Sequence, residues 1–256
     1  MALMKKAPGG ISEAQAAAYV SGRPDYPVAL EEWLRRDLGL GAGTIAVDLG
    51  AGTGKFLPRL LAVGAEVIAI EPSLAMRSQL VSLFPQVDAR DGRAQAIPLA
   101  DESADAVICA QCFHWFASDE ALAEIRRVLR PGGSLGLVWN IRDATVPWVA
   151  RLIEIMAPYD SGTPDYESQE WLKPFPAAGF SELRKRAFAN PQTGTPGKVI
   201  IDRVLSVSTI AKLPLVERDR VMARVQEVID LTPELAAKPE ITFPNTTYVY
   251  DCRAGG

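Results

Sequence analysis

VDLGAGTGKF, residues 47–56, is the stretch that decides the fold of this chain. It continues an apolar run typical of a buried strand and leads into a segment whose leucines have helical spacing. Gly50, Gly52 and Gly54 alternate through the turn between them. Glycine lets a backbone pass close beneath a ligand, and the N-terminus of a helix offers free N–H groups there. The stretch therefore predicts a strand, a ligand-binding turn and a helix.

Two acidic residues accompany this turn, and they narrow the choice of ligand. A dinucleotide-binding turn has a third glycine where Lys55 stands and an apolar residue where Asp48 stands. A carboxylate at Asp48 repels a pyrophosphate and attracts an ammonium group. Glu71, at the end of the next apolar run, is placed to accept hydrogen bonds from ribose hydroxyls. The pair favours a ligand with an amine and a ribose, the alternative being that both acids only cap turns or helices.

Strand-like and helix-like segments alternate around the turn, as in β-α-β units with a buried parallel sheet. The predicted strands are 44–50, 66–71, 105–110 and 133–140, and the predicted helices are 27–38, 55–64, 73–84 and 118–130. Further on, we expect strands at 181–190 and 240–253 and helices at 197–210 and 216–231. The sequence thus predicts an α/β chain with an open, doubly wound sheet, organised as one domain over 1–256. Its cofactor-binding core is 14–142, and 143–180 and 197–232 supply extra helices over one rim.

Composition excludes several classes of function. The 27 lysines and arginines are outnumbered by 31 acidic residues, giving a net charge of −4, whereas nucleic-acid binders carry a concentrated basic patch. No apolar run approaches the roughly 20 residues that span a bilayer, and the N-terminus does not have the pattern of a secretory signal. Three cysteines are too few for a disulfide framework. We expect a cytoplasmic monomer or homodimer without a nucleic-acid or membrane partner.

Beyond the turn, the sequence resembles the class I S-adenosylmethionine-dependent methyltransferases. It is most similar to their small-molecule branch, methyltransferase type 11, which includes trans-aconitate-methyltransferase-like members. The resemblance implies a Rossmann-like, seven-stranded, mostly parallel sheet with an antiparallel last strand and C-terminal helices that cover the substrate. The stretches that carry it are AAAYVSGRPDYP (16–27), VDLGAGTGKF (47–56), VIAIEPSLAM (67–76), DGRAQAIPLADESADAV (91–107), ICAQCFHWF (108–116) and EIRRVLRPGGSLGLVWN (124–140).

The resemblance also implies S-adenosylmethionine as the cofactor and assigns residues to its methionine half. Asp48 and the backbone of Gly50, Ala51 and Gly52 would face that half. A Tyr-x-x-x-Arg-Pro stretch in the N-terminal lead-in would close over the cofactor carboxylate, unless the lead-in merely packs on the sheet. Its two site residues are Tyr19 and Arg23.

The adenosine half follows in the same way. Glu71 would hold the ribose, and Pro72 and Met76 would form a wall beside the adenine. Gln95 departs from the glutamate usual in this family at a loop-bracing position. The remaining cofactor residues implied by the resemblance are Arg93 and Ala94 at the adenine edge and Gln111 and Cys112 beneath the sulfonium.

His114 is the single histidine, and it follows the strand that carries Cys109. It is the candidate catalytic residue, either as a general base or as a residue that only shapes the pocket, because methyl transfer to a carboxylate needs no base. Cys109 and Cys112 form a C-x-x-C motif, but a zinc site needs two more ligands than the chain offers nearby. We therefore predict no metal.

Candidate acceptor-binding residues lie further along the chain. Arg142 follows the last strand of the core, where a guanidinium is suited to clamp an acidic acceptor. The aromatic residues of 143–180 either line the pocket or form the core of their own helical layer. The other candidates are Trp115, Asn140, Ser206 and Tyr248. The sequence predicts methyl transfer to a small-molecule carboxylate or hydroxyl. The alternatives are a scaffold that binds the cofactor without turnover and, less favoured, an NAD-dependent oxidoreductase.

Overall fold

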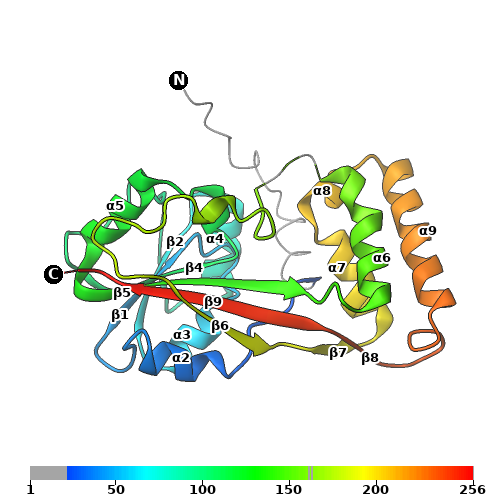
Figure 1. Cartoon of the computed structure of the whole chain (residues 1–256), viewed down its shortest axis with the longest axis horizontal. Helices are drawn as coiled ribbons and strands as arrows, with labels where there is room; N and C mark the ends of the chain where they lie inside the picture. The colour runs from blue at the N-terminus through cyan, green and yellow to red at the C-terminus, as the bar shows by residue number, and fades with distance from the viewer. Residues whose placement is uncertain (1–21, 161, 163, 256) are drawn as a thin grey trace.

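A computed structural model describes residues 22–160, 162 and 164–255, and its centre is a seven-stranded sheet. The strand order is β3-β2-β1-β4-β5-β9-β6, and only β9 runs antiparallel to its neighbours. This confirms the predicted fold class (Figure 1). The strands are β1 (Ile45–Leu49), β2 (Glu66–Ile70), β3 (Asp88–Arg90), β4 (Ala104–Ala110), β5 (Leu129–Arg142), β6 (Arg184–Ala189) and β9 (Asn245–Arg253).

Helices cover both faces of this sheet because its central strands are apolar on both sides. On one face lie α2 (Leu30–Arg36) and α3 (Leu57–Ala62), together with Leu80 of α4 (Leu74–Leu83). On the other face, α5 (Asp119–Val128) packs with the segment around Trp171. Ser73 and Ser118 cap α4 and α5 through their side-chain oxygens, as expected of N-terminal serines. Figure 1 shows the sheet between these layers.

A second group of helices lies beside the sheet, beyond the end of β5 and the start of β9, and has an apolar core of its own (Figure 1). It contains α6 (Pro147–Met156), α7 (Asp202–Leu205), α8 (Ser208–Ala211) and α9 (Leu215–Leu231). A two-stranded sheet of β7 (Gln192–Gly194) and β8 (Ile241–Phe243) joins it to the main sheet. Short helical turns occur at η1 (Phe113–Trp115), η2 (Ala157–Tyr159), η3 (Glu170–Leu172) and η4 (Gly197–Ile201).

Several predicted boundaries were wrong for identifiable reasons. The short edge strand β3 was missed, since its three residues have no apolar run. The predicted strand 240–253 is two strands, because Pro244 has no N–H to donate and lies where the chain leaves one sheet for the other. The predicted helix 197–210 is broken into a π-helical turn and two short helices. No helix in the described part of the chain is long and apolar enough to cross a membrane.

Candidate functional site

The glycine turn connects β1 to α3 at the carboxyl edge of the sheet. Gly50 and Gly52 have φ values of +74° and +58°, in the left-handed region that favours glycine. A Cβ atom at Gly50 would come within 2.9 Å of the Cys112 sulfur, whereas a Cβ atom at Gly52 would meet nothing within 4 Å. The turn is thus tight against β4 at Gly50 and open at Gly52, as a backbone that approaches a ligand must be.

Asp48 lies in β1 beneath this turn and is 1% exposed. Neither of its carboxylate oxygens has a hydrogen-bond partner among the described residues. Burial, and secondarily the charge of Glu71, raises the pKa of Asp48 to about 7. Burying a carboxylate without hydrogen-bond donors costs free energy. The Asp48 site therefore favours binding of a cation or a hydrogen-bond donor from outside the described residues.

Glu71 follows β2 and ties the turn to the next helix. One of its oxygens accepts a hydrogen bond from the Gly52 N–H at 2.9 Å, and the other accepts one from the Ser73 N–H at 2.8 Å. Burial raises the pKa of Glu71, although these two bonds oppose the shift. Each oxygen retains a second lone pair with which it can accept from a ligand hydroxyl.

The candidates for the adenine side come from two segments, the start of α4 after Glu71 and the loop after β3, and they differ in exposure. Met76 of α4 and Ala94 are buried, while Pro72 and Arg93 are exposed. Arg93 exchanges backbone hydrogen bonds with Ala96, which shapes the loop after β3. Tyr19 lies outside the described residues.

Gln111 and Cys112 follow β4 and bring the turn into contact with β5. The Cys112 thiol donates to the Leu49 carbonyl at 3.0 Å, directly beneath Gly50. Gln111 has a left-handed backbone, with φ of +61°, and its side-chain amide donates to the Asn140 carbonyl at 3.1 Å. Cys109, three residues before Cys112, is buried within β4. The structure therefore places both cofactor candidates from this loop next to the glycine turn.

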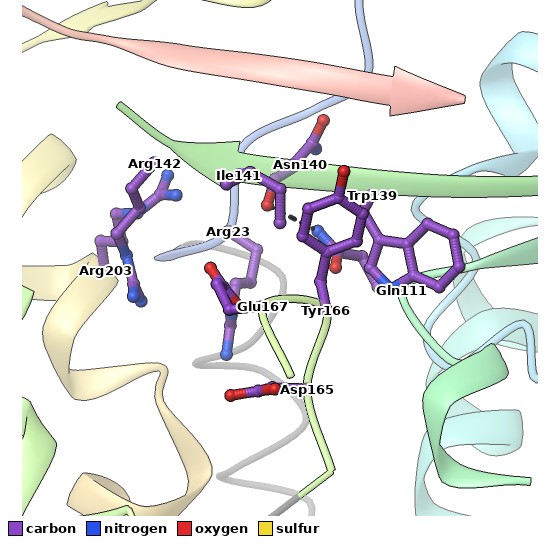
Figure 2. A pocket seen from close by; sticks show the side chains of 10 residues that line it. All are labelled: Arg23, Gln111, Trp139, Asn140, Ile141, Arg142, Asp165, Tyr166, Glu167 and Arg203. Carbon is purple, nitrogen blue, oxygen red and sulfur yellow. Dashed lines mark hydrogen bonds between the residues drawn. The ribbon is translucent and has the colours of Figure 1, made fainter. Parts of the chain in front are cut away.

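A cavity of about 130 Å³ opens beside Gln111, at the ends of β4 and β5. Figure 2 shows Gln111 and Trp139 at one end and Arg142 and Arg203 at the other, with Arg23 and Glu167 between them. Its complete lining is Arg23, Gln111, Trp139, Asn140, Ile141, Arg142, Asp165, Tyr166, Glu167 and Arg203. Three guanidinium groups against two carboxylates make this an electropositive pocket.

The arginines at the far end of the cavity are in an unfavourable setting for a cation. Burial, then the charge of Arg23, lowers the pKa of Arg142 to about 10, which Glu167 partly opposes. Burial, then the charges of Arg142 and Arg23, lowers the pKa of Arg203 well below its ordinary value. With a pKa of about 10, Arg142 still carries its charge near neutral pH. The Arg203 guanidinium lies where the charges of Arg142 and Arg23 repel it. An anion in this cavity would relieve that repulsion.

His114 lies on η1 and is mostly buried behind the near end of the cavity. The indole N–H of Trp139, which lines the cavity, donates to His114 Nδ1 at 3.0 Å. An indole nitrogen can only donate, so Nδ1 is the acceptor and the proton of the neutral ring is on Nε2. Burial lowers the pKa of His114 to about 4, against a smaller opposing effect of Asp165.

Asn140 joins three segments at the cavity wall. Its side-chain amide nitrogen lies 3.5 Å from the carbonyls of both Pro24 and Asp25. Its oxygen accepts from the Thr247 hydroxyl at 2.5 Å and from the Asn190 amide at 3.1 Å. The side chain is thus committed to holding the segment after Arg23 against the sheet, which leaves it little capacity for an acceptor.

The remaining predicted acceptor residues are not in the lining of this cavity. Trp115 is half-buried with its ring 5.3 Å from that of His114. The Ser206 hydroxyl donates to the Arg203 carbonyl, so it stabilises the turn after α7. Tyr248 stacks on Tyr166 at 5.6 Å. The structure brings only Asn140 and Arg142 of the predicted acceptor set to the cavity.

Several residues of the site were missed by sequence reasoning. Arg203 sits in a helix with no motif around it, and Trp139 was read only as part of a strand. Thr53, within the glycine turn, is 2% exposed, and its hydroxyl has no partner among the described residues. Its position between Gly52 and Gly54 was the available signal. The others are Ile141, Asp165 and Glu167. Tyr166, which also lines the cavity, belongs to the aromatic residues of 143–180 for which the sequence left a pocket-lining role open.

A metal centre was not predicted. The described residues contain no group of three or more histidine, cysteine, aspartate or glutamate side chains arranged to hold an ion.

Residues 47–137 match a family described as a methyltransferase domain. The methyltransferase-like protein C25B8.10 of Schizosaccharomyces pombe, itself uncharacterised, is 42% identical over 91% of each chain. Among solved structures, the YcgJ protein of Bacillus subtilis covers 89% of this chain and 99% of its own, with a TM-score of 0.59 and 16% identity. Phosphoethanolamine N-methyltransferase 2 of Haemonchus contortus, bound to S-adenosyl-L-methionine, covers 96% of this chain and 58% of its own, with a TM-score of 0.58 and 15% identity. At these identities the two structures show a common fold.

Proposed function

The chain belongs to the class I S-adenosylmethionine-dependent methyltransferases of the type 11 branch, and from that premise we propose that it methylates a carboxylate of a small-molecule acid. S-adenosylmethionine is the methyl donor of the family, and it supplies an electrophilic methyl group on a sulfonium when bound. The acceptor is the part of the proposal that family membership leaves open. The observation that carries it is the cavity beside Gln111, where three guanidinium groups converge and the neighbouring His114 ring has its acceptor nitrogen occupied by Trp139.

We assign the cofactor to the edge formed by the glycine turn and the ends of β2 and β4. The orphaned Asp48 carboxylate fits the ammonium group of the methionine half, since ammonium supplies both a positive charge and donors. Glu71 fits the ribose, because both of its oxygens are fixed by backbone N–H groups and keep free lone pairs. Gly52, whose Cβ position is open, lets the backbone approach. The residues present therefore fit this cofactor.

The other cofactor assignments rest on their position around these two acids. Met76 and Ala94 provide buried apolar contact on the adenine side, with Pro72 and the backbone of Arg93 at its rim. Gln111 and Cys112 lie between the glycine turn and the cavity. We therefore assign the reacting centre to the Gln111 end of the cavity. Arg23 lines the cavity, and its charge lowers the pKa of both Arg142 and Arg203. Its guanidinium suits a cofactor carboxylate or an acidic acceptor.

The same reasoning divides the chain into a cofactor-binding part and a substrate-covering part. We assign the cofactor-binding core to 14–142, of which 14–21 lie outside the described residues, and the substrate cover to 143–180 and 197–232. Asp165, Glu167 and Arg203 of the assigned cover line the cavity. We infer a single domain, because β5 and β9 run without a break between the sheet and the neighbouring helices (Figure 1).

A carboxylate suits this site because it needs no proton removed. Trp139 occupies His114 Nδ1, and the other ring nitrogen carries the proton, so the neutral imidazole can donate but cannot accept from an acceptor hydroxyl. A carboxylic acid is already ionised near neutral pH. The positive charge of the arginines attracts an anionic acceptor, and the cavity removes part of its water shell, which serves an in-line displacement. His114 is then a residue that positions the pocket rather than a base.

The test is methyl transfer with a panel of small carboxylic acids and, for each, the corresponding primary amide. We expect S-adenosylhomocysteine to form with acids and not with amides of the same shape, because only the acids offer a carboxylate. Equal turnover of alcohols or amines would contradict a carboxylate acceptor. Cofactor binding without turnover on any acceptor in a fraction of small cellular metabolites would indicate a scaffold that binds without catalysis.

A further inference from the structure

The far end of the cavity holds a pair of arginines that the transfer of one methyl group does not require. Arg142 leaves β5, and Arg203 comes from α7 in the cover, so two distant parts of the chain meet there. Gln111, beside the glycine turn, marks the opposite end (Figure 2). If the acceptor carboxylate reacts near Gln111, the end of the cavity at Arg142 and Arg203 can bind another group of the same acceptor molecule.

Arg203 is fixed in place by neutral groups. One terminal nitrogen donates to Asn245 Oδ1 at 2.8 Å, and the other lies 3.5 Å from Gln192 Oε1. Its guanidinium carbon lies 4.6 Å from the centre of the Phe243 ring. The residue is 3% exposed, and its Nε has no hydrogen-bond partner in the described part of the chain. The side chain is therefore rigid, buried and incompletely satisfied.

Neither arginine has an acidic partner of its own. Within residues 22–160, 162 and 164–255, no carboxylate lies within 4.0 Å of either guanidinium, and Arg142 forms no side-chain hydrogen bond. Glu167 acts on Arg142 only through its charge at longer range. Arg203 is buried and Arg142 is half-buried, and holding two like charges together with no carboxylate in contact costs free energy that the fold must offset elsewhere. A bound anion would remove this cost.

We propose that the acceptor carries a second anionic group, remote from the carboxylate that is methylated, and that Arg142 and Arg203 bind it. This inference rests on the proposed function, which supplies the reacting carboxylate. Guanidinium groups pair with carboxylates through two parallel hydrogen bonds, so two of them at a fixed position select a planar anionic group. The acceptor is therefore a dicarboxylate or a closely related dianion. Arg203 is a specificity-determining residue, because it increases the affinity for an acceptor with a second anionic group and takes no part in the displacement.

The test is calorimetric titration of the protein saturated with S-adenosylhomocysteine. The probes are the straight-chain dicarboxylates from three to six carbons and the monocarboxylates of equal length. We expect the best diacid to bind roughly 10- to 100-fold more tightly than its monoacid, the range for a hydrogen-bonded charged group. In Arg142→Gln that preference should fall towards one, with monoacid affinity changed by less than about threefold. Arg203→Lys, which keeps the charge and loses the planar fork, should lose most of the preference.

Arg151→Gln is the matched control, since Arg151 is exposed on α6 and does not line the cavity. It removes one positive charge from the cover and should leave the preference intact. Thermal unfolding of each variant shows whether it is folded. If Arg203→Lys fails to fold, Arg142→Gln decides alone, because that side chain is only half-buried and makes no bond that its removal would break.

The outcomes separate this inference from the proposed function. Equal affinity of the wild-type protein for diacids and monoacids, a preference that survives in Arg142→Gln, or failure of every acid in the series to bind would overturn it. If monoacids are methylated as well as diacids, the carboxylate acceptor stands and the second anionic group is wrong. If diacids bind through the arginines and no methyl ester forms, the anion site stands and the proposed reaction is wrong.

Discussion

The indole N–H of Trp139 donates a hydrogen bond to Nδ1 of His114 across 3.0 Å, and this bond sets the chemistry available at the near end of the cavity. It fixes the tautomer in which Nε2 carries the proton. The sequence alone left two roles open for His114, a general base and a residue that shapes the pocket. The bond and the low pKa of the ring both support the second role.

His114 should therefore leave no titration in the rate of methyl transfer near its ordinary pKa. With the cofactor saturating, kcat/KM for the acceptor should be flat between about pH 5.5 and 7.5, because a ring with a pKa of about 4 stays neutral there. His114→Gln should raise the acceptor KM roughly tenfold and keep kcat within about threefold. A fall in kcat of roughly 10²- to 10⁴-fold, with loss of an acidic limb, would identify a base instead.

Asp48 should oppose stability in the protein without cofactor. Its pKa is higher in the folded chain than in the unfolded one, so the folded state binds the extra proton and loses stability as pH rises from about 4 to 7. Asp48→Asn removes this cost. At pH 8 it should increase the free energy of unfolding by about 2 to 4 kcal/mol while weakening cofactor binding. Denaturant unfolding measures the first effect, and a variant less stable than the wild type at pH 8 would contradict the burial argument.

Cofactor affinity should itself depend on pH through the same carboxylate. An ammonium group stabilises the ionised form of Asp48, so binding lowers its pKa and releases a proton when pH is below about 7. The dissociation constant of S-adenosylhomocysteine should therefore rise as pH falls from 7 to 5.5, by up to about tenfold per unit. Asp48→Asn should bind weakly with little pH dependence over that range. An equally steep dependence in the variant would assign the proton to another group.

Asn140 should be a structural anchor for the cavity wall. Asn140→Ala leaves the buried Thr247 hydroxyl and the Asn190 amide without their acceptor, and it removes the donor to the segment after Arg23. We expect a loss of about 1 to 3 kcal/mol in the free energy of unfolding. Asn190→Ala, at the more exposed edge of the same network, should lose less. Chemical denaturation of both variants compares them, and equal losses would show that the buried Thr247 bond contributes little.

The sequence was most informative where one short stretch specifies both the backbone conformation and the candidate ligand contacts. The positive φ values of VDLGAGTGKF require glycine, and residue types alone predicted both this turn and Asp48 as a candidate ligand contact. The central parallel strands β1, β2, β4 and β5 were predicted because strands buried on both faces are apolar throughout. The fold class followed, and it is confirmed by the sheet order.

The acceptor side was less predictable because it is assembled from parts that are distant in sequence. Arg203 and Arg142 are 61 positions apart and line the same cavity. Of the two short strands between the sheet and the cover, β7 was not predicted, and β8 was predicted only as part of one longer strand. The bond between Trp139 and His114 joins residues of adjacent strand ends, and no periodicity encodes it. Ser206 was selected for its hydroxyl, yet that hydroxyl is used within its own helical turn. Tertiary contact, rather than residue type, decides which of these side chains meet.

The central claim is that the transferred methyl group ends on a carboxylate oxygen, and the stability of the product to base tests it most directly. The protein is incubated with S-adenosylmethionine labelled in its methyl group and a fraction of small cellular metabolites, and the products are then treated with mild alkali. A methyl ester is hydrolysed under these conditions and releases the label as volatile methanol. We predict that the label incorporated by the wild-type protein becomes volatile, and that incorporation falls in Arg142→Gln. Incorporated label that stays non-volatile in alkali would place the methyl group on nitrogen, carbon or an ether oxygen and would contradict the account.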